Sequence, residues 1–228
     1  MSARPSTQAD SGTAVAVFGG TFNPVHYGHL RSAIELVEHL QLHHLDLMPC
    51  AQPVHREQPG CSAEHRAAMV ELAVAGEPRL GCDRRELERE GPSYSYDSLV
   101  DIRQDLGPRR GLCLVMGCDA IQAIATWHRW RELLDVAHVI VIARPGWALP
   151  TEGVVADWLQ VHRCTDPAQL HRQAAGLVYV EELRPLAISS TEIRSLLQLG
   201  QSVRYLLPEP VLDYIDQHDL YRQKENPA

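Results

Sequence analysis

Residues 14–29 read AVAVFGGTFNPVHYGH and combine an apolar run, two adjacent glycines and two histidines three residues apart. An apolar run that ends in Gly19 and Gly20 and then opens a helical pattern is typical of a buried strand followed by a phosphate-binding turn. Glycine lets the backbone come close to an anion, and the N–H groups of a helix start point at it. His26 and His29 lie on the first helical turn, where near pH 7 they can donate hydrogen bonds and carry partial positive charge. The stretch therefore indicates chemistry on a nucleotide phosphate.

Apolar runs alternate with amphipathic stretches along the rest of the chain. The run at 137–143 is nearly all apolar and β-branched, as strands buried on both faces of a parallel sheet are. This alternation predicts an α/β fold with a doubly wound parallel sheet, whose ligands bind beyond the carboxyl ends of the strands. The expected strands are 13–18, 45–49, 80–83, 112–116, 137–143 and 177–180, and the expected helices are 30–40, 62–75, 93–105 and 208–217.

The chain length of 228 residues suits one globular domain. We expect a flexible tail at 1–12, a single domain at 13–220 that ends in a small helical part, and a second tail at 221–228. The segment 145–167 is the least regular and is expected to be a loop with one short helix. No apolar stretch is long enough to span a bilayer, and the N-terminus lacks the apolar middle of a signal peptide. A cytoplasmic protein without membrane contact is therefore expected, with its oligomeric state open.

Charge and residue usage narrow the possible partners. The net charge of -8 argues against broad nucleic-acid binding. Lys224 is the only lysine, which excludes a phosphate loop of the G-x-x-x-x-G-K-[ST] type. Phosphate recognition is expected to rest on arginine, histidine and backbone N–H groups.

The six cysteines form no Cys-x-x-Cys pair and are expected to be reduced and mostly buried. The charged run at 83–90 is expected to be a solvated edge.

A second motif, ISSTEIRS, lies near the end of the chain. Ser189 and Glu192 have the spacing of a capping box, so a helix begins here, and a well-capped helix is the simplest interpretation. The hydroxyls of Ser190 and Thr191 and the guanidinium of Arg194 would also make this helix start a second anion site. The two histidines of the first motif permit a zinc pair instead, but no third ligand stands at metal-site spacing, and no protein-held metal is expected.

Together the two motifs resemble the signatures of the nucleotidyltransferases with the His-x-Gly-His motif, and most closely those of the bacterial nicotinate mononucleotide adenylyltransferases. The resemblance runs in order from about Val15 to Tyr214. Four further segments carry it, namely PCAQPVHR at 49–56, SYSYDSL at 93–99, MGCD at 116–119 followed by Trp127 and Trp130, and RPG at 144–146. The departures are mild: Val54 and Arg56 stand where the family has proline and lysine, Ser95 stands for threonine, and Cys118 for alanine.

The resemblance implies a Rossmann-like enzyme that transfers the adenylyl group of ATP to nicotinate mononucleotide in NAD biosynthesis, with Mg²⁺ accompanying ATP. The catalytic residues that it implies are His26, His29 and Arg194. The ATP-binding residues that it implies are Gly19, Gly20, Thr21, Phe22, Asp119, Ser189, Ser190 and Thr191. The residues that it implies for binding nicotinate mononucleotide are His55, Arg56, Ser95, Trp127 and Arg144.

Three of these residues also have ordinary structural interpretations. Trp127 could be a core residue or a ring that stacks on a pyridine, and Trp130 is the better candidate for packing. Asp119 could cap a helix or accept the ribose hydroxyls, and Arg144 could form a surface ion pair or bind an anion. The resemblance favours the second interpretation for each.

Three rival functions stay open. Relatives in the same superfamily transfer adenylyl groups to phosphopantetheine or cytidylyl groups to small phosphate esters. Nicotinamide mononucleotide could be the acceptor, since its ring differs from that of nicotinate mononucleotide in one polar group. The chain could also bind a nucleotide as a regulator without catalysis.

Overall fold

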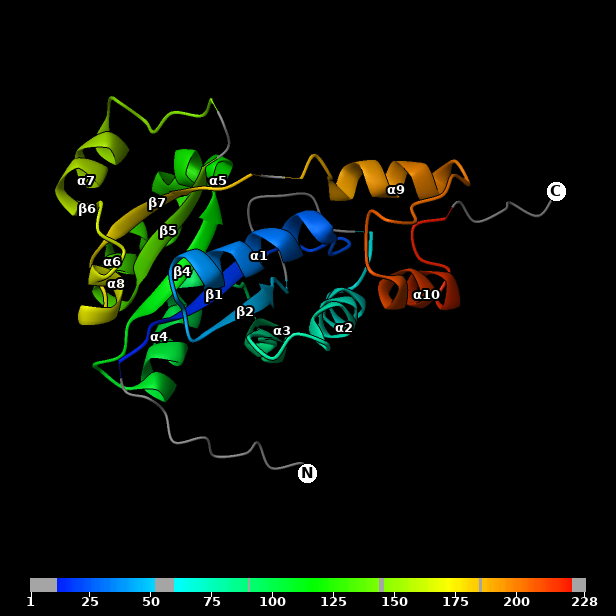
Figure 1. Ribbon diagram of the computed structural model, residues 1–228, viewed down its shortest axis with the longest axis horizontal. Helices are drawn as coiled ribbons and strands as arrows, with labels where there is room; N and C mark the ends of the chain where they lie inside the picture. The colour runs from blue at the N-terminus through cyan, green and yellow to red at the C-terminus, as the bar shows by residue number, and fades with distance from the viewer. Residues whose placement is uncertain (1–11, 52–59, 90, 144–145, 185, 223–228) are drawn as a thin grey trace.

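The centre of the computed structural model, which describes residues 12–51, 60–89, 91–143, 146–184 and 186–222, is a seven-stranded sheet (Figure 1). Every strand pairs parallel to its neighbours, in the order β3-β2-β1-β4-β5-β7-β6. The strands are β1 (Val15–Gly20), β2 (His44–Pro49), β3 (Leu80–Cys82), β4 (Leu112–Gly117), β5 (His138–Ala143), β6 (Arg163–Cys164) and β7 (Val178–Glu182). The helices are α1 (Tyr27–His39), α2 (Ala63–Val74), α3 (Arg85–Glu88), α4 (Ser95–Leu106), α5 (Cys118–Ala123), α6 (Leu133–Val136), α7 (Val154–His162), α8 (Gln169–Arg172), α9 (Ser190–Gln198) and α10 (Glu209–Gln217).

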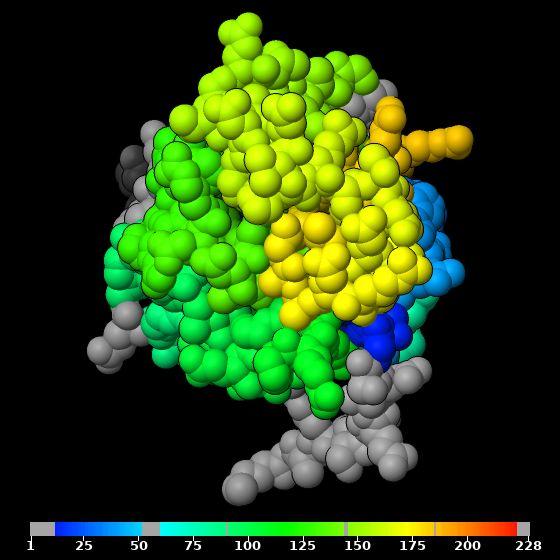
Figure 2. Space-filling view, turned by 90° about the vertical axis from the view of Figure 1, so that its left-hand side faces the viewer, coloured from blue at the N-terminus to red at the C-terminus, as the bar shows by residue number. Residues whose placement is uncertain are grey.

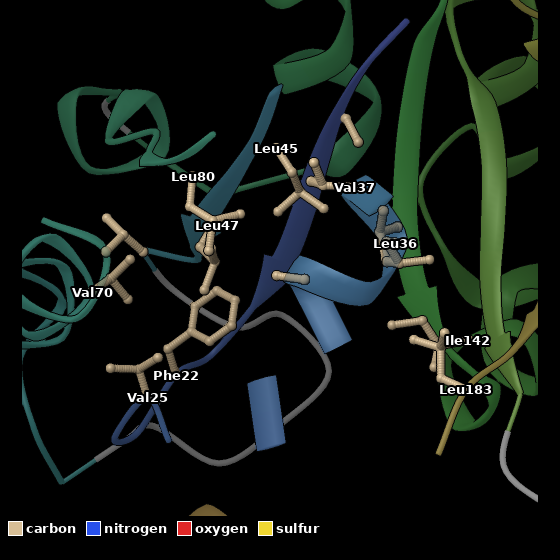
Figure 3. Close-up of a cluster of buried hydrophobic side chains, with 14 of the residues drawn as sticks. Phe22, Val25, Leu36, Val37, Leu45, Leu47, Val70, Leu80, Ile142 and Leu183 are labelled. Atoms are coloured by element: carbon tan, nitrogen blue, oxygen red, sulfur yellow. The ribbon is translucent and has the colours of Figure 1, made fainter. Parts of the chain in front are cut away.

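Helices cover both faces of the sheet, as the alternating pattern predicts. Successive side chains of a strand point to opposite faces. Leu114 of β4 lies in one apolar cluster with Leu99 of α4 and Leu133 of α6. Its neighbour Val115 lies in a second cluster with Leu36 of α1, part of which Figure 3 shows. Every residue of β5 is buried, which confirms the expected strand inside a doubly wound sheet.

The first strand ends later than its apolar run suggests. Gly19 pairs with Met48, and Gly20 pairs with Pro49, so both glycines belong to β1 and the turn starts at Thr21. The glycines were expected to form the turn itself. They stay in the sheet because β2 runs alongside β1 for its whole length and extends the ladder past the last apolar side chain.

The segment expected to be a loop with one short helix contains more regular structure. Its helix α7 is nine residues long and buries Trp158 and Leu159. The following two residues form β6, the edge strand beside β7. Figure 2 shows this side of the molecule, where α7, β6 and α8 form the yellow-green and yellow surface. A two-residue strand is too short to give a periodic signal in the sequence.

The charged run at 83–90 is only partly the solvated edge that was expected. The Glu86 side chain is buried and accepts a hydrogen bond of 3.0 Å from the Ser98 hydroxyl of α4. Burial raises the pKa of the Glu86 carboxyl, and the Ser98 hydrogen bond opposes that rise. One carboxylate of the run therefore anchors α3 to α4, because α3 turns this side chain inward.

Beyond the sheet, α9 and α10 extend to one side, and α10 packs against α2 (Figure 1). Tyr221, expected to start a tail, is partly buried and packs against the core. The expected tail at 1–12 lies almost wholly outside the described residues.

All six cysteines are free, and Cys61, Cys113, Cys118 and Cys164 are buried. Within the described ranges no helix has the length and apolar character that crossing a membrane requires.

Candidate active site

The turn after β1 is held in an unusual backbone conformation. Phe22 has a φ of 48°, in the left-handed region that non-glycine residues rarely adopt, and its side chain is buried. A Cβ at position 20 would lie 2.8 Å from the Phe22 ring, whereas a Cβ at position 19 would meet nothing within 4 Å. Gly20 is therefore required by packing inside the protein. Gly19 is the glycine that leaves space for a ligand to approach the backbone.

His26 and His29 stack on each other at the start of α1. Their ring centroids are 3.7 Å apart with an interplanar angle of 26°, and the Phe22 and His29 ring centroids are 5.0 Å apart in an edge-to-face contact. A Cβ at position 28 would lie 2.9 Å from two atoms of the His26 ring. The glycine between the two histidines is therefore needed for the rings to stack in this way.

These two imidazoles differ from a buried histidine elsewhere in the sheet. The Nδ1 atoms of His26 and His29 are buried without a hydrogen-bond partner. His138 in β5 is also buried, but its Nε2 lies 3.0 Å from the Gln173 carbonyl and its Nδ1 accepts from the Leu177 amide at 3.1 Å. Buried polar groups are normally paired, so these two ring nitrogens are candidates for hydrogen bonds to a ligand, whereas His138 is held by the backbone.

Both imidazoles are neutral in the free protein at pH 7. Burial lowers the pKa of His26 from 6.5 to about 4. Burial also lowers the pKa of His29 well below its usual range, and the neighbouring His26 adds to this. The expectation from the sequence that His26 and His29 carry partial positive charge near pH 7 is therefore wrong for the free protein. A neutral imidazole still carries one N–H and can donate one hydrogen bond.

The lowered pKa predicts how His26 affects stability at acidic pH. Since the folded protein holds His26 neutral, only the unfolded chain binds a proton as the pH falls from 6.5 towards 4. The free energy of unfolding should therefore fall across this window, by about 3 kcal/mol from this residue, and should be unaffected by it above pH 6.5. His26→Gln should show a weaker decline, measured by urea denaturation at several pH values. Equal declines in both proteins would contradict the assignment.

The start of α9 meets the turn after β1, although the two are far apart in the sequence. Arg194 donates from Nη1 to the Asn23 carbonyl at 2.8 Å. The Ser190 hydroxyl donates to the Pro24 carbonyl at 2.9 Å. Ser189 caps α9 by accepting from the Glu192 amide at 3.1 Å, as its spacing predicts. The starts of α1 and α9 therefore lie together at the carboxyl end of β1.

The remaining ATP-binding candidates lie around this turn or one strand away. Thr191 is exposed, and its hydroxyl lies 3.5 Å from Nη2 of Arg194. Asp119 is exposed on the first turn of α5, directly after β4, and Gly117 occupies the cap position. The helix-cap interpretation of Asp119 is therefore excluded, and its carboxylate is accessible at the carboxyl end of the sheet.

Tyr221 was not singled out in the sequence, yet it supports the turn. Its hydroxyl donates to Oδ1 of Asn23 at 2.6 Å, and the Asn23 side chain is buried. Asn23 is thus held through its side chain by the C-terminal segment and through its carbonyl by Arg194. A tyrosine near the chain end gives no periodic or motif signal, so only the fold shows this contact.

The segments expected to bind the acceptor also meet. The centroids of the Tyr94 and His128 rings are 4.4 Å apart, and the Arg129 guanidinium lies 3.9 Å from the centroid of the Tyr96 ring. These contacts bring the start of α4, with Ser95, beside the segment that contains Trp127.

The two tryptophans of this segment differ in burial. Trp130 is buried and packs edge-on against Trp158 at 5.6 Å, as expected, whereas Trp127 is half-buried. Trp127 therefore has ring surface available for stacking. Three further candidates, His55, Arg56 and Arg144, lie outside the described residues, and their roles stay predictions.

Comparisons with known proteins agree with this geometry. A cytidylyltransferase-like family model matches residues 17–196. A probable nicotinate-nucleotide adenylyltransferase from Marinomonas sp. is 43% identical over 92% of this chain and 95% of its own length. Another from Pseudomonas aeruginosa is 46% identical over 92% of this chain and 98% of its own length. The solved structure of Plasmodium falciparum nicotinic acid mononucleotide adenylyltransferase complexed with NaAD has a TM-score of 0.67 at 18% identity, covers 92% of this chain and 97% of its own, and supports the fold. The chain therefore belongs to the nicotinate-nucleotide adenylyltransferase family of cytidylyltransferase-like proteins.

Proposed function

We propose that the protein joins ATP and nicotinate mononucleotide, giving nicotinate adenine dinucleotide and pyrophosphate. The observation that carries the proposal is the meeting of two helix starts at the end of β1. There two stacked imidazoles with unpaired ring nitrogens lie near a guanidinium fixed by Asn23. Such an arrangement suits a nucleotide triphosphate, because helix starts, imidazole N–H groups and arginine all bind phosphate oxygens. The names of the relatives support the same reaction.

The reaction needs positioning and charge stabilisation rather than a base. A phosphate oxygen of the mononucleotide attacks the α-phosphorus of ATP, a new P–O bond forms, and the bond to pyrophosphate breaks. The attacking monoester is already largely a dianion at neutral pH, since its second pKa is about 6. Neutral His26 and His29 can therefore serve as hydrogen-bond donors to the transferred phosphoryl group. Arg194 and the Ser189 hydroxyl face the charge that develops on the leaving pyrophosphate, while the Ser190 hydroxyl, which donates to the Pro24 carbonyl, holds the start of α9 against the turn.

Mg²⁺ fits this site as a companion of ATP. In the described part of the chain, no group of three or more histidine, cysteine or carboxylate side chains is placed to hold a metal ion. Mg²⁺ is commonly bound through substrate phosphates with few protein ligands, so the phosphates of ATP would supply most of its ligands here. When bound with ATP, the ion supplies charge neutralisation on the phosphate oxygens.

The acceptor is expected to occupy the space beside the start of α4. The half-buried Trp127 ring can stack on the pyridine, and the Ser95 hydroxyl can hydrogen-bond to the nicotinate. Both segments are held together by the Tyr94–His128 contact, which fixes the spacing of the two groups.

A pyrophosphate-release assay with matched acceptors tests the function. With ATP and Mg²⁺, nicotinate mononucleotide should give a kcat/KM at least ~10-fold above that of nicotinamide mononucleotide, because the two rings differ in one hydrogen-bonding group. Phosphopantetheine with ATP, and small phosphate esters with CTP, serve as the controls for the sibling reactions. Turnover with a control but with neither pyridine mononucleotide would overturn the proposal, and ATP binding without any product would favour a regulator.

A further inference from the structure

Arg66 on α2 lies behind the turn after β1, and neither motif includes it. Its side chain is 1% exposed. Nη1 donates to the Thr21 carbonyl at 2.8 Å, and Nη2 donates to the carbonyls of Cys50 at 2.7 Å and Ala51 at 3.2 Å. Thr21 follows β1 and Cys50 follows β2, so one guanidinium joins the carboxyl ends of two adjacent strands.

Among the described residues no carboxylate forms an ion pair with the Arg66 guanidinium, and the buried Glu86 carboxylate instead accepts a hydrogen bond from the backbone of Ala51. The hydrogen bonds of Arg66 go to backbone carbonyls and to the Cys50 sulfur, and its Nε is buried without a partner. An arginine stays protonated in proteins, and an unpaired buried charge is costly. The fold therefore maintains a permanent positive charge directly beneath the Gly19–Phe22 stretch.

The positive charge of Arg66 matters for phosphate binding because the two histidines of the first motif supply none. His26 and His29 are neutral in the free protein, since burial lowers the pKa of each. The chain as a whole carries a net charge of -8, which repels a polyphosphate. Of the cations described at the turn, Arg194 approaches from the solvent side through Asn23 and Arg66 lies within the protein. A charge in a low-dielectric interior acts over a longer range than one in water.

We propose that Arg66 is a positioning residue that holds the Thr21 turn against the Cys50–Ala51 segment and supplies a fixed positive charge to the phosphates of the nucleotide. The identity of that nucleotide as ATP rests on the proposed function. Arg66 acts through the backbone and through its field, and it touches no reacting atom.

The same chain contains a matched control for a merely structural arginine. Arg103 of α4 also binds backbone carbonyls, donating to Val136 at 2.9 and 3.0 Å and to Ala174 at 2.6 Å. Val136 precedes β5 and Ala174 precedes β7, so Arg103 lies at the amino end of the sheet, away from the turn. Arg103→Met removes a less buried arginine, which likewise binds backbone carbonyls, from the opposite end of the fold.

The test is the affinity of the full chain for adenosine, AMP and ATP, measured by calorimetric titration below the melting temperature. Arg66→Met should weaken ATP binding by about 10-fold and adenosine binding by less than ~2-fold, because the lost charge acts on phosphates. Arg66→Lys keeps the charge and should retain most of the preference for ATP. Arg103→Met should lower the melting temperature and leave the ratio of the two affinities unchanged.

Several outcomes would overturn the proposal. In folded Arg66→Met, equal losses of ATP and adenosine affinity would show a purely structural residue, and so would unchanged affinities. Loss of the ATP preference in folded Arg66→Lys would assign the effect to the hydrogen bonds alone. If Arg66→Met does not fold, Arg66→Gln provides a neutral side chain that still donates to a carbonyl. The titrations need no turnover, so a wild-type protein that binds ATP but makes no product would count against the proposed function and leave this inference testable.

Discussion

Replacing His29 with alanine is expected to lower kcat for dinucleotide formation by at least ~100-fold, the usual effect of removing one preorganised donor to a developing charge. The imidazole is neutral in the free protein, so the loss should come from its N–H rather than from a cation. The KM for ATP should change much less, since the donor acts mainly in the transition state. Steady-state kinetics with both substrates varied would measure the split.

Arg31 provides the control for the His29 variant. It lies two residues further along α1, its side chain is half exposed, and its ion pair is with Glu35 on the same helix at 2.8 Å. Arg31→Ala should therefore leave kcat within ~2-fold, as surface substitutions usually do. Circular dichroism must show that the His29 variant is folded, because the His29 ring packs against Phe22. A folded variant that turns over at near the wild-type rate would remove His29 from the mechanism.

Arg194→Met is expected to reduce kcat/KM for ATP by about 100-fold, since a charge-assisted phosphate contact and the support of the turn are lost together. The substitution removes the 2.8 Å hydrogen bond to the Asn23 carbonyl as well as the guanidinium. Arg194→Lys should recover part of the loss, because an ammonium restores the charge without the planar fork. Rates at saturating and limiting ATP would separate the two effects.

A surface arginine checks the Arg194 result. Arg204 is exposed, and its ion pair with Glu209 spans 3.5 Å near α10. Arg204→Met should behave like the wild type, since exposed ion pairs contribute little. If Arg194→Lys were as impaired as Arg194→Met, the geometry of the fork rather than its charge would matter. A fully active Arg194→Met would place the β- and γ-phosphates away from α9.

Much of this fold could be predicted because its physical signals are local. An apolar run such as β5 shows its burial directly, and Ser189 with Glu192 marks the start of α9 three residues apart. The prediction was less complete where a contact spans the chain. Nothing beside Arg66 in the sequence shows that its guanidinium reaches two strand ends, and nothing near Tyr221 points to Asn23.

Burial also changed the chemistry that the sequence suggested. A histidine in a motif can be assigned a role from its type, but its charge depends on how much water surrounds it in the fold. The same limit applies to Glu86, which sits in a run of charged residues and is nevertheless buried. Patterns in sequence report which face of an element is apolar, and they do not report which single polar side chain is turned inward.

The hydrogen bond between Tyr221 and Asn23 has a consequence for how the protein is made. The loop after β1 is synthesised well before Tyr221, which lies 198 residues further along the chain than Asn23. A nascent chain therefore has this loop without the Tyr221 hydrogen bond until the segment that contains Tyr221 has left the ribosome. Full support of the loop consequently comes late in synthesis, after the strands of the sheet have been made.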